Sequence, residues 1–309
     1  MTIRDNYPLK NFTTMAIGGP ARIFIDFESV AELKEILRFA DEYRLPRAIV
    51  GEGSNLIPSD EGFSGVVIAN RVRLFRRKGP IVSIGAGNNL LETIKKTNRL
   101  GLAGLEKMAG IPGTVGGALY GCAGAYGQEI KDHLRKVRFF DGERVRVLSR
   151  AECRFGYRKS IFKTHKDWVI LDADFRLDPN DPGVLDAISS DILRKRAIKY
   201  PPGLRCPGSF FKNIKLDDLK PKERTRLLRQ IPQDQVTYGK VAAGVLLERV
   251  RAKGMREGSI AVAKHHANLI YNPGGGSASD VLLLAQRLKK LVKNKFGITI
   301  QEEVQYLEF

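Results

Sequence analysis

GIPGTVGGALYGCAGAYGQE, residues 110–129, holds seven glycines, and most of its other residues are small. A stretch with so few large side chains cannot build a hydrophobic core, so its backbone is the working part. Glycine permits positive φ and close approach of the main chain to another group, and successive amides in such turns can bind an anion. The alternative is a glycine-rich connection or a small-residue helix. A second loop of the same kind shifts the balance towards an anion site.

The second loop is GEGSN, residues 51–55, which follows the apolar run 48–50 and therefore lies where a buried strand would end. Its glycines, serine and asparagine could donate several hydrogen bonds to phosphate oxygens. Neither loop has the GxxxxGK[ST] pattern of a P-loop. The nearest dinucleotide fingerprint is GAGNNL at 85–90, where Leu90 replaces the third glycine, so a conventional Rossmann site is disfavoured.

Six motifs follow one another along almost the whole chain. They are GEGSNLI, GLAGLEKMAGIPGTVGGALYGCAGAYGQE, FGYRKSIF at 155–162, PGSFFKN at 207–213, HHANLIYN at 265–272 and FGITIQEEV at 296–304. In order and spacing the set resembles the bacterial UDP-N-acetylenolpyruvoylglucosamine reductase family, also called UDP-N-acetylmuramate dehydrogenase. Six motifs in the same order make chance agreement implausible.

The resemblance implies an α+β protein with two domains. Residues 1–178 would form a two-lobed FAD-binding fold of the vanillyl-alcohol oxidase (PCMH) type, and residues 179–309 a smaller α+β substrate-binding domain. The boundary falls at DPNDPG, residues 178–183, the clearest turn-forming segment of the chain. The chain resembles the shorter, second type of the family, because the span between Leu177 and Ser209 leaves little room for the longer type's insertion.

The reaction that the resemblance implies is reduction of UDP-N-acetylglucosamine enolpyruvate to UDP-N-acetylmuramate, in peptidoglycan precursor synthesis. NADPH would pass a hydride to FAD, and FAD would pass one to the terminal carbon of the enolpyruvyl double bond. Negative charge then develops on the substrate carboxylate. The site therefore needs a fixed cation, a second hydrogen-bonding or acidic group, and a proton donor.

Three residues match the family's catalytic positions. Arg158 in FGYRKS corresponds to the arginine that orients the carboxylate, and its guanidinium can make two parallel hydrogen bonds. Ser209 in PGSFFKN corresponds to the serine that protonates the intermediate carbon. Glu303 in QEEVQ corresponds to the catalytic glutamate, near the end of the expected last strand. Alternation would place Glu302 and Glu303 on opposite faces of that strand, so only one could point into the site.

The loop of the expected proton donor departs from the family pattern. Pro207 precedes the Gly-Ser pair where the family usually has Ala or Cys, and Cys206 stands one place earlier. Cys206 is therefore the second choice as proton donor. A serine hydroxyl is a weak acid, so neighbours must stabilise its conjugate base, and Lys212 is one candidate.

The resemblance also implies contacts to the cofactor and the substrate. The cofactor contacts belong to the two glycine-rich loops: Gly51, Gly53, Ser54, Asn55, Leu56, Gly113, Thr114, Gly116, Gly117, Ala118, Gly124, Ala125 and Gly127. The substrate contacts are Tyr157, Lys212, Asn213 and Asn268. No histidine lies in either loop, so the FAD is expected to be non-covalent.

Periodicity predicts most helices and strands. Alternation over 22–27 indicates a strand, and Ser29 with Glu32 forms a capping-box pattern before a helix over 30–45. Further helices are predicted over 89–100, 182–199, 242–251 and 278–296, further strands at VVIA, IVSI, VRFF, VRVL and WVILDADFRL, and a closing strand over ITIQEEVQYL, residues 298–307.

Composition restricts the class of protein. A chain of 309 residues is long enough for two domains. Its apolar runs fall short of the ~18 residues that a membrane span needs, and MTIRDNYPLK has no apolar stretch for a secretory signal. We therefore expect a cytoplasmic protein without membrane insertion, as a monomer or weak oligomer. Cys122, Cys153 and Cys206 lack paired spacing, so neither a disulfide nor a metal site is expected.

The formal net charge of +18 indicates either anionic partners or a solvated basic surface. The basic clusters are spread over the whole length and interleaved with acids, and no nucleic-acid-binding signature accompanies them, so no nucleic-acid partner is expected. A positive field could also steer FAD, NADPH and the nucleotide-sugar substrate. Two alternatives stay open, another FAD oxidase or dehydrogenase of the same fold and a basic nucleic-acid-binding protein.

Overall fold

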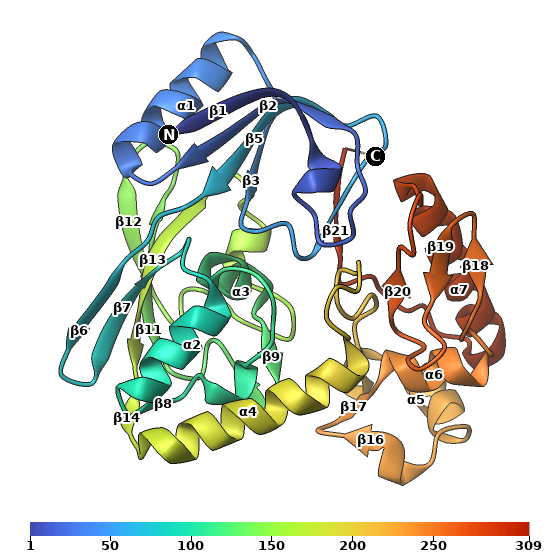
Figure 1. Ribbon diagram of the computed structural model, residues 1–309. Helices are drawn as coiled ribbons and strands as arrows, with labels where there is room; N and C mark the ends of the chain where they lie inside the picture. The colour runs from blue at the N-terminus through green and yellow to red at the C-terminus, as the bar shows by residue number, and fades with distance from the viewer. Residues whose placement is uncertain (309) are drawn as a thin grey trace. The chain divides into compact units, whose positions relative to one another are not determined.

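The computed structural model describes residues 1–308 and forms two compact units (Figure 1). Unit 1 consists of Met1–Tyr7, Ala21–Gly53 and Ser64–Ile198. Unit 2 consists of Pro8–Pro20, Ser54–Phe63 and the chain from Lys199 on. The domain boundary predicted at residue 178 stays a prediction, because compact units need not coincide with the domains that bind cofactor and substrate.

A four-stranded sheet and one helix form the first half of unit 1. The strand order is β1-β2-β5-β3, formed by Thr2–Pro8, Pro20–Phe27, Phe63–Asn70 and Arg47–Val50. Helix α1 (Val30–Glu42) buries Leu33, Ile36 and Ala40 in the core of this sheet. The predicted cap of α1 is confirmed, since Ser29 Oγ accepts the Glu32 amide at 3.2 Å.

A five-stranded antiparallel sheet forms the second half of unit 1. The strand order is β12-β11-β13-β7-β6, formed by Val145–Ser149, Leu134–Phe140, Val169–Arg176, Ile81–Gly85 and Phe75–Lys78. These strands confirm four predictions in the sequence, from IVSI to WVILDADFRL, and β5 confirms VVIA. Three helices, α2 (Leu90–Arg99), α3 (Val115–Gly121) and α4 (Pro182–Lys199), contribute buried side chains to its core.

Short strand pairs complete unit 1. They are β8 (Leu102–Ala103) with β14 (Asp178–Pro179), and β9 (Gly124–Ala125) with β10 (Gln128–Glu129). The second pair belongs to the glycine-rich stretch, which therefore contains a helix, α3, followed by a small hairpin. The main chain of this stretch is ordered by internal pairing, as a binding surface made of backbone requires.

Unit 2 is built around α7 (Ala278–Phe296), which buries an apolar stripe that includes Val281, Leu284, Leu288 and Val292. Ser277 and Asp280 form a capping box at its start, and Gly297 at φ +79 ends the helix. The other helices are α5 (Pro221–Leu228) and α6 (Ala243–Arg249). The strands are β15 (Ile214–Lys215), β17 (Lys240–Val241) and β16 (Val236–Thr237); β18 (Arg256–Glu257), β19 (Ile260–Val262) and β20 (Ile270–Tyr271); and β21 (Gln305–Leu307) with β4 (Leu56–Pro58).

The predicted closing strand over 298–307 is wrong in extent. Only Gln305–Leu307 forms a strand, β21, which pairs in parallel with β4. Upstream of it, Glu302 makes an isolated bridge with Phe211. The segment changes partner between these two pairings, so a regular strand cannot run through Glu303. Glu303 precedes the last strand and does not lie near its end.

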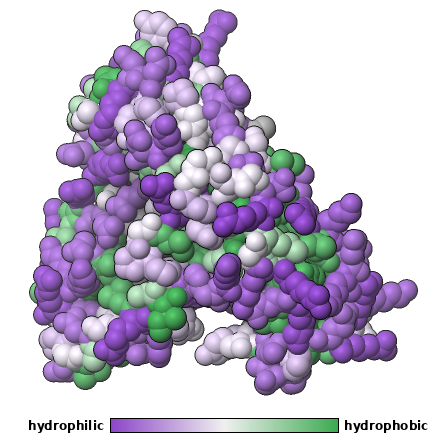
Figure 2. Space-filling model, turned by 45° about the vertical axis from the view of Figure 1, so that its right-hand side comes forward, coloured by the Kyte–Doolittle hydropathy of each residue, from purple (hydrophilic) through white to green (hydrophobic). Residues whose placement is uncertain are grey.

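Hydrophilic residues cover most of the face drawn in Figure 2, in keeping with a net charge of +18. Within residues 1–308, no helix is both long enough and apolar enough to cross a lipid bilayer. In the same part of the chain, none of the three cysteines forms a disulfide, and no three His, Cys, Asp or Glu side chains gather as a metal site.

Candidate active site

The two glycine-rich loops, far apart in the sequence, touch within unit 1. A Cβ added to Gly51, just after β3, would lie 2.7 Å from Thr114 Oγ1. Thr114 is the N-cap of α3, and its Oγ1 accepts the Gly117 amide at 3.1 Å. A Cβ added to Gly116 would lie 2.9 Å from the Ala86 Cβ. The side chains of Thr114 and Ala86 thus approach the main chain so closely that only glycine fits without a shift at either position.

Main-chain amides at the contact of these loops can receive an anion. Among residues 1–308, the amides of Glu52, Gly53, Gly113 and Thr114 have no hydrogen-bond acceptor. These four donors come from both loops, and unsatisfied main-chain amides are the groups that hold phosphate oxygens in nests. The residues present therefore fit the diphosphate of a dinucleotide cofactor.

The predicted cofactor residues of α3 contribute in a different way. The amides of Gly116, Gly117 and Ala118 donate within the chain, to Ala86 O at 2.8 Å, Thr114 Oγ1 at 3.1 Å and Thr114 O at 2.9 Å. They are not available as donors to a ligand. The small size of Gly116 instead allows α3 to pack closely against Ala86.

The rest of the first loop belongs to unit 2. Asn55 Nδ2 donates to the main-chain oxygen of Glu303 at 3.0 Å, and the Gln305 amide donates to Asn55 O at 2.9 Å. Leu56 starts β4, which pairs with β21. One predicted cofactor residue, Asn55, thus holds the backbone of a predicted catalytic residue, Glu303.

Arg158 is tied to the glycine-rich stretch. Its Nη1 donates to Cys122 O at 3.1 Å and its Nη2 to Gly124 O at 3.1 Å. Its backbone is left-handed, with φ +55, and its carbonyl accepts Lys163 Nζ at 3.1 Å. The guanidinium lies 5.1 Å from the centre of the Tyr157 ring. No local pattern in the sequence predicts these two carbonyl contacts.

Cys122, whose carbonyl Arg158 holds, is a buried small side chain. Burial, and then the Glu129 carboxylate, raise the pKa of the Cys122 thiol to about 11. The thiol therefore stays protonated at neutral pH and is a poor nucleophile.

Ser209 and Glu303 lie on neighbouring segments of unit 2. The Glu303 amide donates to Phe210 O at 2.8 Å, next to Ser209 in the chain. The Ser209 hydroxyl lies 2.8 Å from the hydroxyl of Tyr200, at the end of α4. The structure therefore brings two of the three predicted catalytic residues to adjacent backbone, and it adds a tyrosine that the sequence did not single out.

Asn268 holds the segment that carries Ser209. Its side chain accepts the Phe211 amide at 2.8 Å and donates to Phe211 O at 2.9 Å, and its carbonyl accepts the Phe210 amide at 3.0 Å. Asn268 is 3% exposed. The structure thus shows this predicted substrate contact as a brace for the backbone after Ser209.

The other predicted substrate contacts also have partners in the protein. Lys212 Nζ donates to Gln301 Oε1 at 3.5 Å, at the long end of hydrogen-bond distance. Asn213 Oδ1 accepts the amide of Ala243, the first residue of α6, at 3.3 Å.

Glu302 and Glu303 are distinguished by their contacts. Lys289 Nζ donates to both carboxylate oxygens of Glu302, at 3.0 and 3.1 Å. Glu302 thus ties the segment to α7, which is a structural role. The choice of Glu303, made from the family motif, stays a prediction, and the regular strand expected to place the two glutamates on opposite faces is absent.

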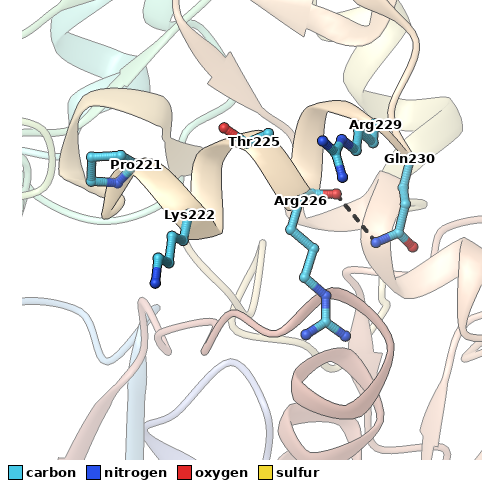
Figure 3. A pocket seen from close by; sticks show the side chains of 6 residues that line it. All are labelled: Pro221, Lys222, Thr225, Arg226, Arg229 and Gln230. Carbon is cyan, nitrogen blue, oxygen red and sulfur yellow. Dashed lines mark hydrogen bonds between the residues drawn. The ribbon is translucent and has the colours of Figure 1, made fainter.

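A surface hollow of about 600 Å³ lies along α5, apart from the residues discussed so far (Figure 3). It is lined by Pro221, Lys222, Thr225, Arg226, Arg229 and Gln230. Arg226 donates to the carbonyls of Asn294 at 3.3 Å and Lys295 at 3.1 Å, so its charge is used at the C-terminal end of α7. None of the predicted site residues lines this hollow.

Two family models match most of this chain. The model "FAD binding domain" matches residues 21–147, and the model "UDP-N-acetylenolpyruvoylglucosamine reductase, C-terminal domain" matches residues 200–307. A UDP-N-acetylenolpyruvoylglucosamine reductase from Solibacter usitatus is 43% identical and covers 99% of this chain and 97% of its own. One from Carboxydothermus hydrogenoformans is 34% identical, with coverage of 99% and 94%.

A solved structure is also similar over the full length. The crystal structure of UDP-N-acetylenolpyruvylglucosamine reductase from Thermus caldophilus has a TM-score of 0.76 with 29% identity, and covers 99% of this chain and 98% of its own. The predicted fold class is confirmed by this similarity and by the match of the FAD-binding model.

Proposed function

We propose roles for three residues of this chain, which belongs to the UDP-N-acetylenolpyruvoylglucosamine reductase family. Arg158 orients the substrate carboxylate and stabilises the charge that develops on it. Ser209 protonates the carbon that bears the carboxylate. Glu303 supplies the second acidic group at that carbon. The adjacency of Ser209 and Glu303, through the 2.8 Å bond from Glu303 N to Phe210 O, supports this assignment.

The function is reduction of UDP-N-acetylglucosamine enolpyruvate to UDP-N-acetylmuramate, in peptidoglycan precursor synthesis, with FAD as cofactor and NADPH as electron donor. Bound FAD supplies the hydride that reaches the terminal carbon of the enolpyruvyl group. The contact between Gly51 and Thr114 is the observation of this chain that supports the cofactor assignment, because it joins the two loops that carry the four available amides. We propose non-covalent binding by the two glycine-rich loops, in a cytoplasmic protein that is a monomer or weak oligomer.

The visible spectrum of the anaerobic protein tests this function. Absorbance near 450 nm should bleach with one equivalent of NADPH and return with the enolpyruvyl substrate. A yellow protein that bleaches without recovery would point to another substrate for the same fold. A colourless protein that cannot be reconstituted with FAD, and binds nucleic acid with steep salt dependence, would support the nucleic-acid alternative.

Replacing Gly51 by alanine should weaken FAD binding by about tenfold or more. The new Cβ would overlap Thr114 Oγ1, which is already fixed by the Gly117 amide, and overpacking of this kind costs about 1–3 kcal/mol. The measurement is the FAD dissociation constant from quenching of flavin fluorescence. Gly121→Ala is the matched control, because nothing lies within 4 Å of its added Cβ. Equal FAD affinity in both variants would contradict FAD binding at the contact of the two glycine-rich loops.

Glu303→Gln should slow reoxidation of the reduced flavin by substrate about 100-fold, because one group that stabilises the transition state is lost. Glu302→Gln is the control, since Glu302 makes an ion pair with Lys289 that is partly exposed. Its loss should lower the free energy of unfolding by less than about 1 kcal/mol and leave both half-reactions intact. Stopped-flow absorbance and chemical denaturation measure the two effects. If Glu302→Gln slowed reoxidation and Glu303→Gln did not, the roles of the two glutamates would be exchanged.

A further inference from the structure

The hydroxyl of Ser209 faces a second hydroxyl. Tyr200 OH and Ser209 Oγ are 2.8 Å apart, a normal distance for an O–H···O hydrogen bond in which either atom can donate. Gly208, at φ +85, makes the left-handed turn that leads into Ser209. Lys212, the neighbour expected to assist this serine, has Gln301 as its side-chain partner.

The ring of Tyr200 is held on two sides. The imidazole of His266 packs against it edge-on, with ring centres 6.3 Å apart and an interplanar angle of 90°. The ammonium of Lys199 lies 5.7 Å from the centre of the Tyr200 ring, and the Lys199 carbonyl lies 3.0 Å from His265 Nε2. Burial, and then the nearby Lys199, lower the pKa of His266 to about 3, so His266 is neutral at neutral pH. These contacts keep the Tyr200 hydroxyl in one direction.

We propose that Tyr200 is a positioning residue for proton donation by Ser209, an inference that rests on the proposed role of Ser209. Before the reaction, the Tyr200 hydroxyl fixes the direction of the serine O–H. As the proton leaves, Tyr200 donates its own hydrogen to the serine oxygen, where negative charge develops. A hydrogen bond to a charged group is about twice as strong as one between neutral groups, so the assistance is greatest in the transition state.

The proton transfer is balanced in atoms and electrons. The Ser209 O–H bond breaks, and its proton forms a C–H bond at the carbon that bears the carboxylate. The electron pair of the broken O–H bond stays on the serine oxygen, which accepts the Tyr200 hydrogen bond. The former double bond thereby becomes a single bond, with hydride added at the terminal carbon, and water then returns a proton to Ser209.

Tyr200→Phe in the FAD-loaded enzyme tests the proposal. Reduction by NADPH should proceed at the wild-type rate, whereas reoxidation by substrate should slow about 10- to 100-fold. The solvent deuterium isotope effect on reoxidation should rise, because proton transfer becomes more rate-limiting. Tyr271→Phe is the matched control, a half-buried tyrosine of unit 2 whose hydroxyl makes no hydrogen bond within residues 1–308, and it should change none of these values.

A double variant separates this proposal from the role of Ser209. Adding Tyr200→Phe to Ser209→Ala should slow reoxidation no further, because Tyr200 acts only through the serine. Additive slowing, an unchanged isotope effect in Tyr200→Phe, or equal slowing of both half-reactions would overturn the role of Tyr200. Wild-type reoxidation by Ser209→Ala would instead overturn the proposed role of Ser209. If Tyr200→Phe fails to fold, Tyr200→Leu must show the same split between half-reactions.

Discussion

Ser209→Ala should slow reoxidation of the reduced flavin by the enolpyruvyl substrate about 10²- to 10⁴-fold, the usual contribution of a general acid. The other half-reaction, bleaching by NADPH, should keep its rate, because it requires no proton donor at the substrate carbon. Stopped-flow absorbance near 450 nm measures the two steps separately. The backbone should hold its place, since Asn268 and Glu303 make hydrogen bonds to the main chain of Phe210 and Phe211 that do not involve the Ser209 hydroxyl.

The Cys206→Ala variant tests the alternative proton donor. Cys206 is half-buried, and its carbonyl accepts Thr14 Oγ1 at 2.8 Å, so its backbone is fixed. Rapid reoxidation by Ser209→Ala together with slow reoxidation by Cys206→Ala would transfer the proton-donor role to Cys206. Loss of NADPH bleaching in Ser209→Ala would show that the loop had collapsed, and circular dichroism would check this.

Local signals in the sequence predicted most of the fold. The Ser29 cap acts within three residues, and the structure shows Ser29 accepting the expected Glu32 amide. The closing strand was overextended because its partners, Phe211 for Glu302 and β4 for β21, are far away in the chain. Helix α5 and strands β16 and β17 were not predicted. The two strands are only two residues long and show no periodicity.

The candidate site also has parts that could be predicted from the sequence and parts that could not. The glycine-rich loops could be found from composition, because a backbone surface needs residues without side chains. The hydrogen bond between Tyr200 and Ser209 could not be predicted, since nothing in the spacing of nine residues specifies that their hydroxyls meet. The two carbonyl contacts of Arg158 span 36 and 34 residues and likewise leave no local pattern.

Arg158→Lys should leave a folded, yellow protein whose reoxidation by substrate is about 10²- to 10³-fold slower. Lysine keeps the positive charge but cannot hold a carboxylate through two parallel hydrogen bonds. Arg154→Lys is the matched control, because Arg154 is also left-handed, with φ +47, and is exposed. The measurements are the rate of reoxidation, the rate of bleaching by NADPH and the FAD dissociation constant of each variant.

Two roles of Arg158 can be told apart by these three values. Its guanidinium donates to the carbonyls of Cys122 and Gly124, so the substitution also loosens the glycine-rich stretch. If that were its main role, FAD affinity and bleaching would fall together with reoxidation. The carboxylate role requires that reoxidation falls far more than the other two, because developing charge on the substrate exists only in that step. Unchanged reoxidation in Arg158→Lys would remove Arg158 from the site and leave it a brace for the loop.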